Sequence, residues 1–408
     1  MSRAFHTVLL AILCLTGCEK DVVGEVAREV ASGTAGEVKP PDVQPVSEAE
    51  AKAFAERLLT AAQGSDAQGI ERLIDFRVAV RRALTGLKLH EMMLEQTTAG
   101  VMTGARTAGL VHQLSTIASR GDSLKLLQTR SDDDGRWATV RLILASGGFE
   151  HYDFLLSKGD DGRVVAYDVH FMTSGELLSQ TMRRSLIAAL DLDKGLLERL
   201  SERDNELREH MKDILEAQQK IAAGNAPAAA AIYEGLPDSV RREKFVLLAW
   251  VQSVALTGDE ARHARALKEL LRTFPSDPAA TVASIDHYFL KREFDKAIAA
   301  IDEVEKTTAP DPYFGLMRTN ALIEMKRYDD ARKQIERVIA AEPDLLTAHF
   351  TLVAILLAQK AHDETAQQLL MMAKQFGLEY DLPAVPDYAD FVASPRYARF
   401  LQELKGAP

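Results

Sequence analysis

The chain has 408 residues, which is enough for two or three domains of the usual size. Apolar residues make up 47% and charged residues 27%, the balance of a globular protein, and this excludes wholesale disorder and a polytopic membrane protein. The net charge is -11 and there is no basic tract, so nucleic acid and anionic lipid are poor main partners. A protein partner is favoured.

The two cysteines, Cys14 and Cys18, stand close together at the start of the sequence. No cysteine follows them, which excludes a disulfide framework for the folded part. One positive charge, Arg3, precedes an apolar run from Val8 to Leu15 that is too short to span a membrane as a stable helix. Residues 1–17 are therefore predicted to be a secretory signal peptide.

The end of this segment, Leu15-Thr16-Gly17-Cys18, resembles the lipobox of bacterial lipoproteins. The resemblance implies cleavage before Cys18 and acylation of its thiol and its amine by palmitate-type chains. Two or three such chains hold a protein firmly at a membrane, because each buried methylene contributes about 0.8 kcal/mol. The next residue is Glu19 and not the aspartate that resembles an inner-membrane retention signal in enteric bacteria. The expected location is the periplasmic face of the outer membrane.

Composition and capping then predict where folding begins. Residues 18–46 are expected to be the lipidated cysteine and a flexible tether, since they are rich in Glu, Val, Gly and Pro. Ser47-Glu48-Ala49-Glu50 is a capping box that predicts a helix start, and Gly64 predicts its end. A second helical stretch is expected over residues 66–117, with a break near Thr85-Gly86.

From Ser123 the hydrophobic period changes to two, which predicts β-strands. The expected strands are residues 124–130, 137–146, 149–158 and 163–172, separated by Gly- and Asp-rich turns. Helices followed by an antiparallel meander define an α+β domain over residues 47–185. Its element order resembles the cystatin-like or nuclear-transport-factor-like α+β cone, whose mouth binds a small molecule in some relatives and is packed shut in others.

The last two expected strands suggest a candidate metal or acid/base site. With Gly159 to Gly162 as the loop, Asp153 lies opposite Asp168 and His151 lies opposite His170. Carboxylates and imidazoles are ligands that zinc accepts, and two opposed carboxylates repel each other. The alternative is a solvated sheet face, and it is favoured because the register is assumed. No metal or other cofactor is expected.

The region from residue 186 to residue 408 is predicted to be all-α and repetitive. Its helices carry small residues at intervals of 34, 33, 34 and 35, namely Ala230, Ala264, Ala297, Ala331 and Ala366. With Tyr328 in a turn and Pro343 after a helix, this pattern resembles the tetratricopeptide repeat. Four units are expected from about residue 244, a degenerate unit over about 205–240, and a capping helix over 394–404. The glycine usual in the middle of helix A is replaced by Thr319 and Ile285.

The resemblance implies that the first helix of each pair, helix A, lines a concave groove that binds protein segments. The family's groove positions map onto Leu248, Gln252, Val282, Asp286, Phe289, Leu316, Asn320, Ile323, Phe350 and Leu357. Glu324 stands where family members that clamp a terminal carboxylate need a basic residue. An amphipathic or extended apolar segment is therefore the expected ligand, unless the protein's own capping helix fills the groove.

No P-loop, Gly-x-Ser-x-Gly elbow, paired His-x-x-x-His or dinucleotide glycine motif is present, so an enzyme is not expected. The predicted fold class is an α+β N-terminal domain, with helices and an antiparallel meander, followed by an all-α tetratricopeptide-type solenoid. The predicted function is a lipid-anchored cell-envelope scaffold or adaptor that binds a protein partner through its groove. Two alternatives stay open: small-ligand binding or metal-dependent hydrolysis in the α+β cone, and a purely structural assembly factor of an envelope complex.

Overall fold

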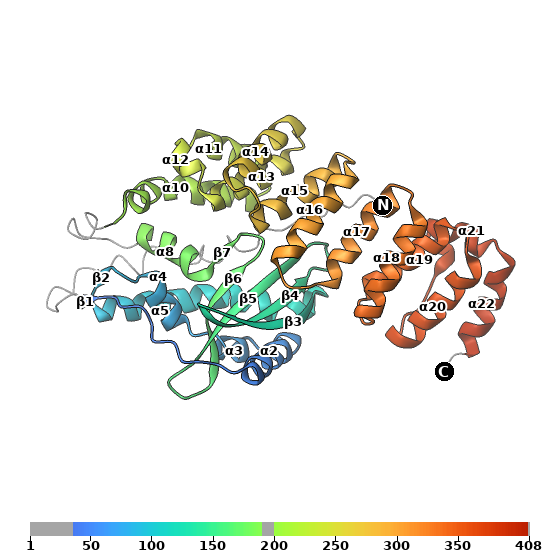
Figure 1. Cartoon of the computed structure of the whole chain (residues 1–408), viewed down its shortest axis with the longest axis horizontal. Helices are drawn as coiled ribbons and strands as arrows, with labels where there is room; N and C mark the ends of the chain where they lie inside the picture. Colours follow the sequence, from blue (N-terminus) through green and yellow to red (C-terminus); the bar gives the residue numbers. More distant parts are fainter. Residues whose placement is uncertain (1–35, 190–199, 407–408) are drawn as a thin grey trace. The chain divides into compact units, whose positions relative to one another are not determined.

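The structure is a computed structural model, and it describes residues 36–189 and 200–406. The chain divides into two compact units, one up to Ala283 and one from Ser284 onward. Figure 1 shows the helices and strands of both units. The predicted signal peptide and the predicted lipidation site at Cys18 lie outside the described residues.

The first long helix, α2, spans Glu48–Gln63 as the capping box predicts. The amide of Glu50 donates to the Ser47 hydroxyl at 3.3 Å, and the amide of Ser47 donates to the Glu50 carboxylate at 2.8 Å. Phe54 and Leu58 lie fully buried on one face of the helix. Helix α2 packs against the sheet, and Figure 1 shows it together with α3 on one side of the strands.

The stretch predicted as a helix with one break is interrupted several times, because acidic side chains cap new helices inside it. Asp66 accepts from the Gly69 amide at 2.8 Å, and Asp75 accepts from the Val78 amide at 3.0 Å. The elements are α3 (Ala67–Arg72), α4 (Phe76–Ala83), β2 (Lys88–Leu89), α5 (Glu91–Thr107), α6 (Leu110–Ser115) and α7 (Ile117–Arg120). The expected break near Thr85-Gly86 is the end of α4.

The sheet is a five-stranded antiparallel meander in chain order. Its strands are β3 (Ser123–Asp132), β4 (Gly135–Ile143), β5 (Phe149–Lys158), β6 (Val164–Phe171) and the short β7 (Glu176–Leu177). Alternate residues such as Val140, Phe154 and Val169 face the helices and form the core of the α+β domain. Four of the strands were predicted, whereas β7 is too short to show a period.

The pairing of β5 with β6 corrects the predicted register. The turn has one residue more than assumed, so Lys158 pairs with Val164, and a β-bulge places Tyr167 as an extra residue. The bulge adjoins Ala166, whose backbone exchanges hydrogen bonds with Leu73 and Asp75. Asp153 therefore pairs with His170, and Leu155 pairs with Asp168. The predicted oppositions of Asp153 with Asp168 and of His151 with His170 are both wrong.

The described part of the chain also corrects the expected end of the tether. Strand β1 (Gly36–Glu37) pairs with β2, and Val38 and Val46 are buried in the core. The Gln44 amide donates to the Ser157 hydroxyl at 2.9 Å, and Arg136 donates to the Val46 carbonyl at 3.2 Å. Residues 36–46 are thus part of the α+β fold.

Within the first unit, the α+β domain packs directly against the first helices of the array, and the expected boundary at residues 185 and 186 falls inside a helix. Helix α8 (Leu178–Ala189) crosses that boundary, and Leu186 belongs to the sheet core. Helix α10 (Glu202–Ala222) packs against α8. The ammonium group of Lys244, at the start of α13, donates to the Gly175 carbonyl at 2.8 Å, and the Arg184 guanidinium lies 3.9 Å above the Phe245 ring.

The helix pairs of the array follow one another at a constant interval. The first helices of the pairs, called A, begin at residues 244, 278, 312 and 346. They are α13 (Lys244–Thr257), α15 (Pro278–Leu290), α17 (Pro312–Glu324) and α19 (Leu346–Ala358). The second helices, called B, begin at residues 226, 260, 294, 328 and 362. They are α11 (Ala226–Gly235), α14 (Glu260–Thr273), α16 (Phe294–Thr307), α18 (Tyr328–Ala341) and α20 (His362–Phe376). This constant interval, about 34 residues, is that of the tetratricopeptide repeat.

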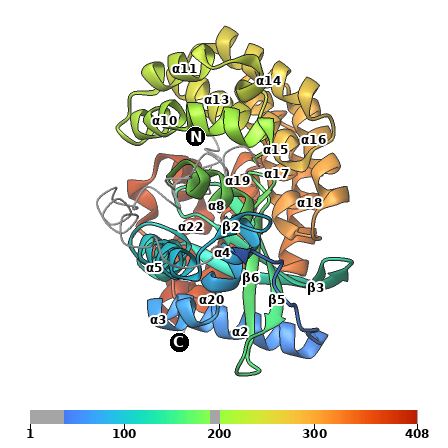
Figure 2. The ribbon, with the colours of Figure 1, turned by 90° about the vertical axis from the view of Figure 1, so that its left-hand side faces the viewer.

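Successive helices of the array pack side by side, as Figures 1 and 2 show for α10, α11, α13 and α14. Short 3-10 turns and α21 (Ala389–Val392) follow the last pair, and α22 (Pro395–Gly406) begins as the predicted capping helix does. Helix α22 packs on α20, and its Phe400 contacts Phe391 of α21, with ring centroids 5.7 Å apart. An α+β region followed by an all-α tetratricopeptide-like solenoid is the predicted fold class, which is confirmed.

Among the described helices, none combines the length and the apolar character needed to cross a membrane.

Candidate functional site

The predicted groove residues fall on three recurring positions of the A helices: the fifth, the ninth and the twelfth residue. Leu248, Val282, Leu316 and Phe350 are fifth residues, as the helix starts show. Gln252, Asp286 and Asn320 are ninth residues, and Phe289, Ile323 and Leu357 are twelfth residues. Ten residues chosen from a family pattern thus occupy equivalent places in successive repeats.

Burial separates these residues into two groups. Leu248, Val282 and Leu316 are nearly fully buried, at 2% exposure each, and such side chains serve packing. Phe350 is 41% exposed in the same repeat position. The ninth and twelfth residues are half-buried. Phe289 packs on the Phe294 ring at 5.9 Å, and Leu357 packs on the apolar cluster beneath the capping helix.

The structure adds a row that the sequence argument missed, at the thirteenth residue of each helix A, in its last turn. Leu256 and Leu290 occupy this place in successive repeats, and they are 45% and 54% exposed. Glu324 and Ala358 occupy it in the next two repeats and are also exposed. The sequence contained a sign of this row, because it has two leucines at equivalent repeat positions, outside the packing face of the helix.

The capping helix covers only part of this surface in the last repeat. Phe400 packs on α20 and joins a cluster with Val353 of α19. Phe350 is nevertheless 41% exposed, and Ala354 one turn later is exposed too. We call the accessible side chains of the A helices in the second unit the helix A surface; they include Leu290, Asn320, Glu324 and Phe350. Apolar side chains beside polar ones suit an apolar or amphipathic protein segment.

The second candidate site is the predicted metal or acid/base site on the sheet. The observed register places its four residues in separate clusters. His170 Nδ1 lies 3.4 Å from the Asp153 carboxylate, which also accepts from the Thr139 hydroxyl at 2.5 Å. Asp153 is desolvated, yet the hydrogen bonds from His170 and Thr139 hold its pKa below the usual range. Buried His151 has its ring 5.6 Å from that of Phe149.

Asp168 belongs to a different cluster with a structural role. Its carboxylate accepts from the Ser179 amide at 3.0 Å and from the Ser179 hydroxyl at 2.5 Å, and so caps the start of α8. Arg82 Nε lies 2.9 Å away. Burial raises the pKa of Asp168 despite these partners. The described residues contain no group of three His, Cys, Asp or Glu side chains placed to hold a metal ion.

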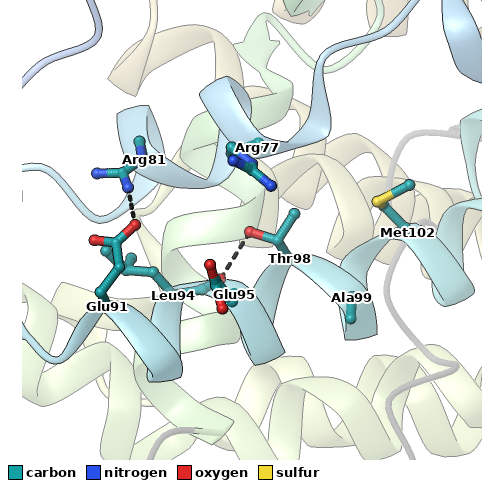
Figure 3. Close-up of a pocket in the computed structure, with 8 residues that line it drawn as sticks. All are labelled: Arg77, Arg81, Glu91, Leu94, Glu95, Thr98, Ala99 and Met102. Carbon is teal, nitrogen blue, oxygen red and sulfur yellow. Dashed lines mark hydrogen bonds and ion pairs between the residues drawn. The ribbon is translucent and has the colours of Figure 1, made fainter.

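A cleft of about 370 Å³ lies between α4 and α5 (Figure 3). Arg77 and Arg81 face Glu91 and Glu95 across it, with an ion pair between Arg81 and Glu91. The Thr98 hydroxyl donates to the Leu94 carbonyl at 2.7 Å. Two cations therefore stand against two anions, and the cleft offers no excess charge to a charged ligand.

No protein-family model matches the chain, and no curated protein matches it. Among solved structures, the chain is similar to the crystal structure of a thermophilic TPR protein from Thermus thermophilus. The identity is 15%, over 48% of this chain and 99% of that one, with a TM-score of 0.31. The description of the array as tetratricopeptide-like rests on the constant interval between its helix pairs.

Proposed function

We propose that this chain is a lipid-anchored scaffold of a bacterial cell envelope, which binds a protein partner through the A helices of its repeats. The observation that carries the binding role is the exposure of apolar side chains at recurring A-helix positions. Phe350 and Leu290 are 41% and 54% exposed, and both lie on A helices. Exposed apolar residues of this size that line a repeat surface are typical of partner-binding sites.

The anchoring part of the proposal is supported by sequence alone. Leu15-Thr16-Gly17-Cys18 resembles a lipobox, and Glu19 favours the outer membrane. The described fold begins at Gly36, so the segment 19–35 separates the cysteine from it. Fully extended, this segment reaches at most about 60 Å, which sets how far from the lipid a bound partner can be held.

The binding role is tested with Phe350→Asp. A charge in a desolvated contact is expected to weaken binding of the partner by about 2 kcal/mol, roughly 30-fold, with thermal unfolding unchanged because the residue is exposed. Ala340→Asp, at an exposed position of α18, introduces the same charge and is the matched control. Crosslinking from position 350 in envelope extract identifies the partner, and binding is then measured with purified protein. Equal binding by both variants would refute the helix A surface as the site.

The anchor is tested with Cys18→Ser. Lipid labelling and membrane fractionation should both be lost, leaving an uncleaved or soluble product. A Cys14→Ser variant should be processed as the wild type is. Continued attachment of Cys18→Ser to the outer membrane through a lipid would contradict the anchoring proposal and leave the binding proposal standing.

A further inference from the structure

The turn between helix A and helix B contains one residue in the left-handed backbone region, and it recurs in each repeat. The positions are 224, 258, 292, 326 and 360. The first two are Gly224 and Gly258, with φ of 75° and 73°. The last three are Arg292, Lys326 and Lys360, with φ between 56° and 58°. We call these three residues, all in the second unit, the turn row.

Glycine adopts this conformation freely, whereas a residue with a Cβ is strained in it. The first two repeats thus have glycine at this turn position, whereas the next three have a long basic residue in a strained backbone conformation. Strained backbone that persists where a relaxed residue is available points to a role for the side chain.

The contacts that the three cations make within the protein are weak. The Arg292 guanidinium lies 5.6 Å from the centroid of the Phe294 ring, a contact that contributes little when the cation is exposed. Arg292 lies 3.6 Å from Glu324, with side-chain exposures of 70% and 43%. Lys360 lies 3.5 Å from Asp390, with exposures of 74% and 57%. Ion pairs this exposed contribute little to stability. Lys326 is exposed and has no carboxylate partner within the described residues.

The residues of the turn row lie between the paired helices of three successive repeats, α15 and α16, α17 and α18, and α19 and α20. Helices α17 and α19, which are equivalent in successive repeats, contact each other. Packed helices stand about 8–10 Å apart, so neighbouring cations of the row are on the order of 10 Å apart. An extended chain rises about 3.3 Å per residue, so every third residue of such a chain matches this spacing.

We propose that the turn row binds an extended acidic segment of a protein partner, with a carboxylate at about every third residue. Acidic residues lie next to the row in the first turns of the B helices, namely Asp295, Asp329, Asp330, Asp363 and Glu364. They repel a broad anionic surface such as a membrane and leave room for a narrow ligand. The turn row is a second contact surface of the proposed scaffold, and it adjoins the helix A surface, because Arg292 lies 3.6 Å from Glu324.

The test removes the charges without harming the fold. In the full chain, Arg292, Lys326 and Lys360 are all replaced by glycine, the residue that the first two repeats use. The probe is a fluorescent peptide of about 12 residues with glutamate at every third position, against the same peptide with glutamine. The triple variant should lose about tenfold or more in affinity for the glutamate peptide while its thermal unfolding midpoint stays or rises.

The matched control removes three exposed lysines from the B helices, by Lys306→Gln, Lys333→Gln and Lys374→Gln. It changes the net charge equally and should leave peptide affinity within about twofold. Phe350→Asp should also bind the acidic peptide normally, which keeps this test separate from that of the helix A surface.

Three outcomes would overturn the proposal. The first is an equal loss in the triple glycine variant and the lysine control, which would indicate non-specific attraction. The second is no preference for glutamate over glutamine in the peptide. The third is binding to phosphatidylglycerol vesicles that the glycine variant loses, with no peptide binding, which would assign the row to a membrane surface.

Discussion

The conformation of Lys326 has a direct energetic consequence. A residue with a Cβ in the left-handed region costs about 1–2 kcal/mol of stability. Glycine avoids this strain, but its more flexible unfolded chain offsets about 0.5–1 kcal/mol of the gain. Lys326→Gly should therefore stabilise the protein by about 0.5–1 kcal/mol, measured by chemical denaturation. Gly258→Ala at the equivalent position should destabilise it by about 1 kcal/mol. A loss of stability in Lys326→Gly would mean that the lysine side chain makes favourable contacts.

Glu150 is the buried carboxyl from which a pH dependence is expected. It is 3% exposed and accepts from the amides of Thr173 and His151 at 3.0 and 2.9 Å. Burial raises its pKa above the usual 4.5 in spite of these bonds. The folded protein then binds more protons than the unfolded chain, so this group lowers the free energy of unfolding as the pH rises from about 4 toward neutrality.

Glu150→Gln keeps a neutral acceptor and should remove this contribution. The variant should gain stability relative to the wild type as the pH is raised from about 4 to about 7 in urea denaturation series. Glu209→Gln, on the exposed face of α10, should follow the wild type at every pH. A constant difference between Glu150→Gln and the wild type across this range would show that Glu150 does not change its protonation on unfolding.

At the scale of elements, helices α17 and α18 approach each other closely. Ala331 is fully buried, and a Cβ on Gly315 would lie 2.6 Å from Val338 Cγ2. Ala331→Leu should overpack this crossing and cost about 1–3 kcal/mol. Ala340→Leu, at an exposed position of α18, should cost less than about 0.5 kcal/mol. Thermal unfolding of both variants measures the difference, and equal stability would mean that the crossing can expand.

Sequence patterns predicted the helix pairs well because their period is long and repeated. The predicted alanines were separated by 33 to 35 residues and not by a constant interval, because some of them are the fourth residue of helix B and others are the fifth. The structure shows the buried fourth position at Ala229, His263, Ala297, Ala331 and Thr365, with a constant interval between them. His263 fills that place in α14, whereas the predicted Ala264 is only half-buried.

The sheet site was not predictable in the same way. Register depends on turn length and on bulges, and one extra residue changes every later partner. Tyr167 bulges beside Ala166, which bonds to Leu73 and Asp75 from a distant part of the chain. The alternation of apolar and polar residues along a strand does not reveal such a long-range contact. The sequence therefore provided no basis for pairing Asp153 with Asp168.

At the scale of the molecule, the change of period near residue 186 suggested two domains, yet the first compact unit extends to Ala283. The α+β domain therefore covers the start of the helical array, where a solenoid needs a cap. The contacts responsible join residues remote in sequence, such as Lys244 with Gly175 and Arg184 with Phe245. Local patterns cannot reveal them.

Lys244 joins the α+β domain to the first repeats of the array. Lys244 Nζ, mostly buried, bridges the Gly175 carbonyl at 2.8 Å and the Asp277 carboxylate at 2.9 Å. Lys244→Ala removes a charged donor from both groups and should cost about 1.5–3 kcal/mol. Because sheet and helices share one unit, hydrogen exchange should accelerate in β6, α8 and α13 together. Lys268→Ala, exposed on α14, should change none of them. Faster exchange confined to α13 would mean that the α+β domain and the first repeats unfold separately.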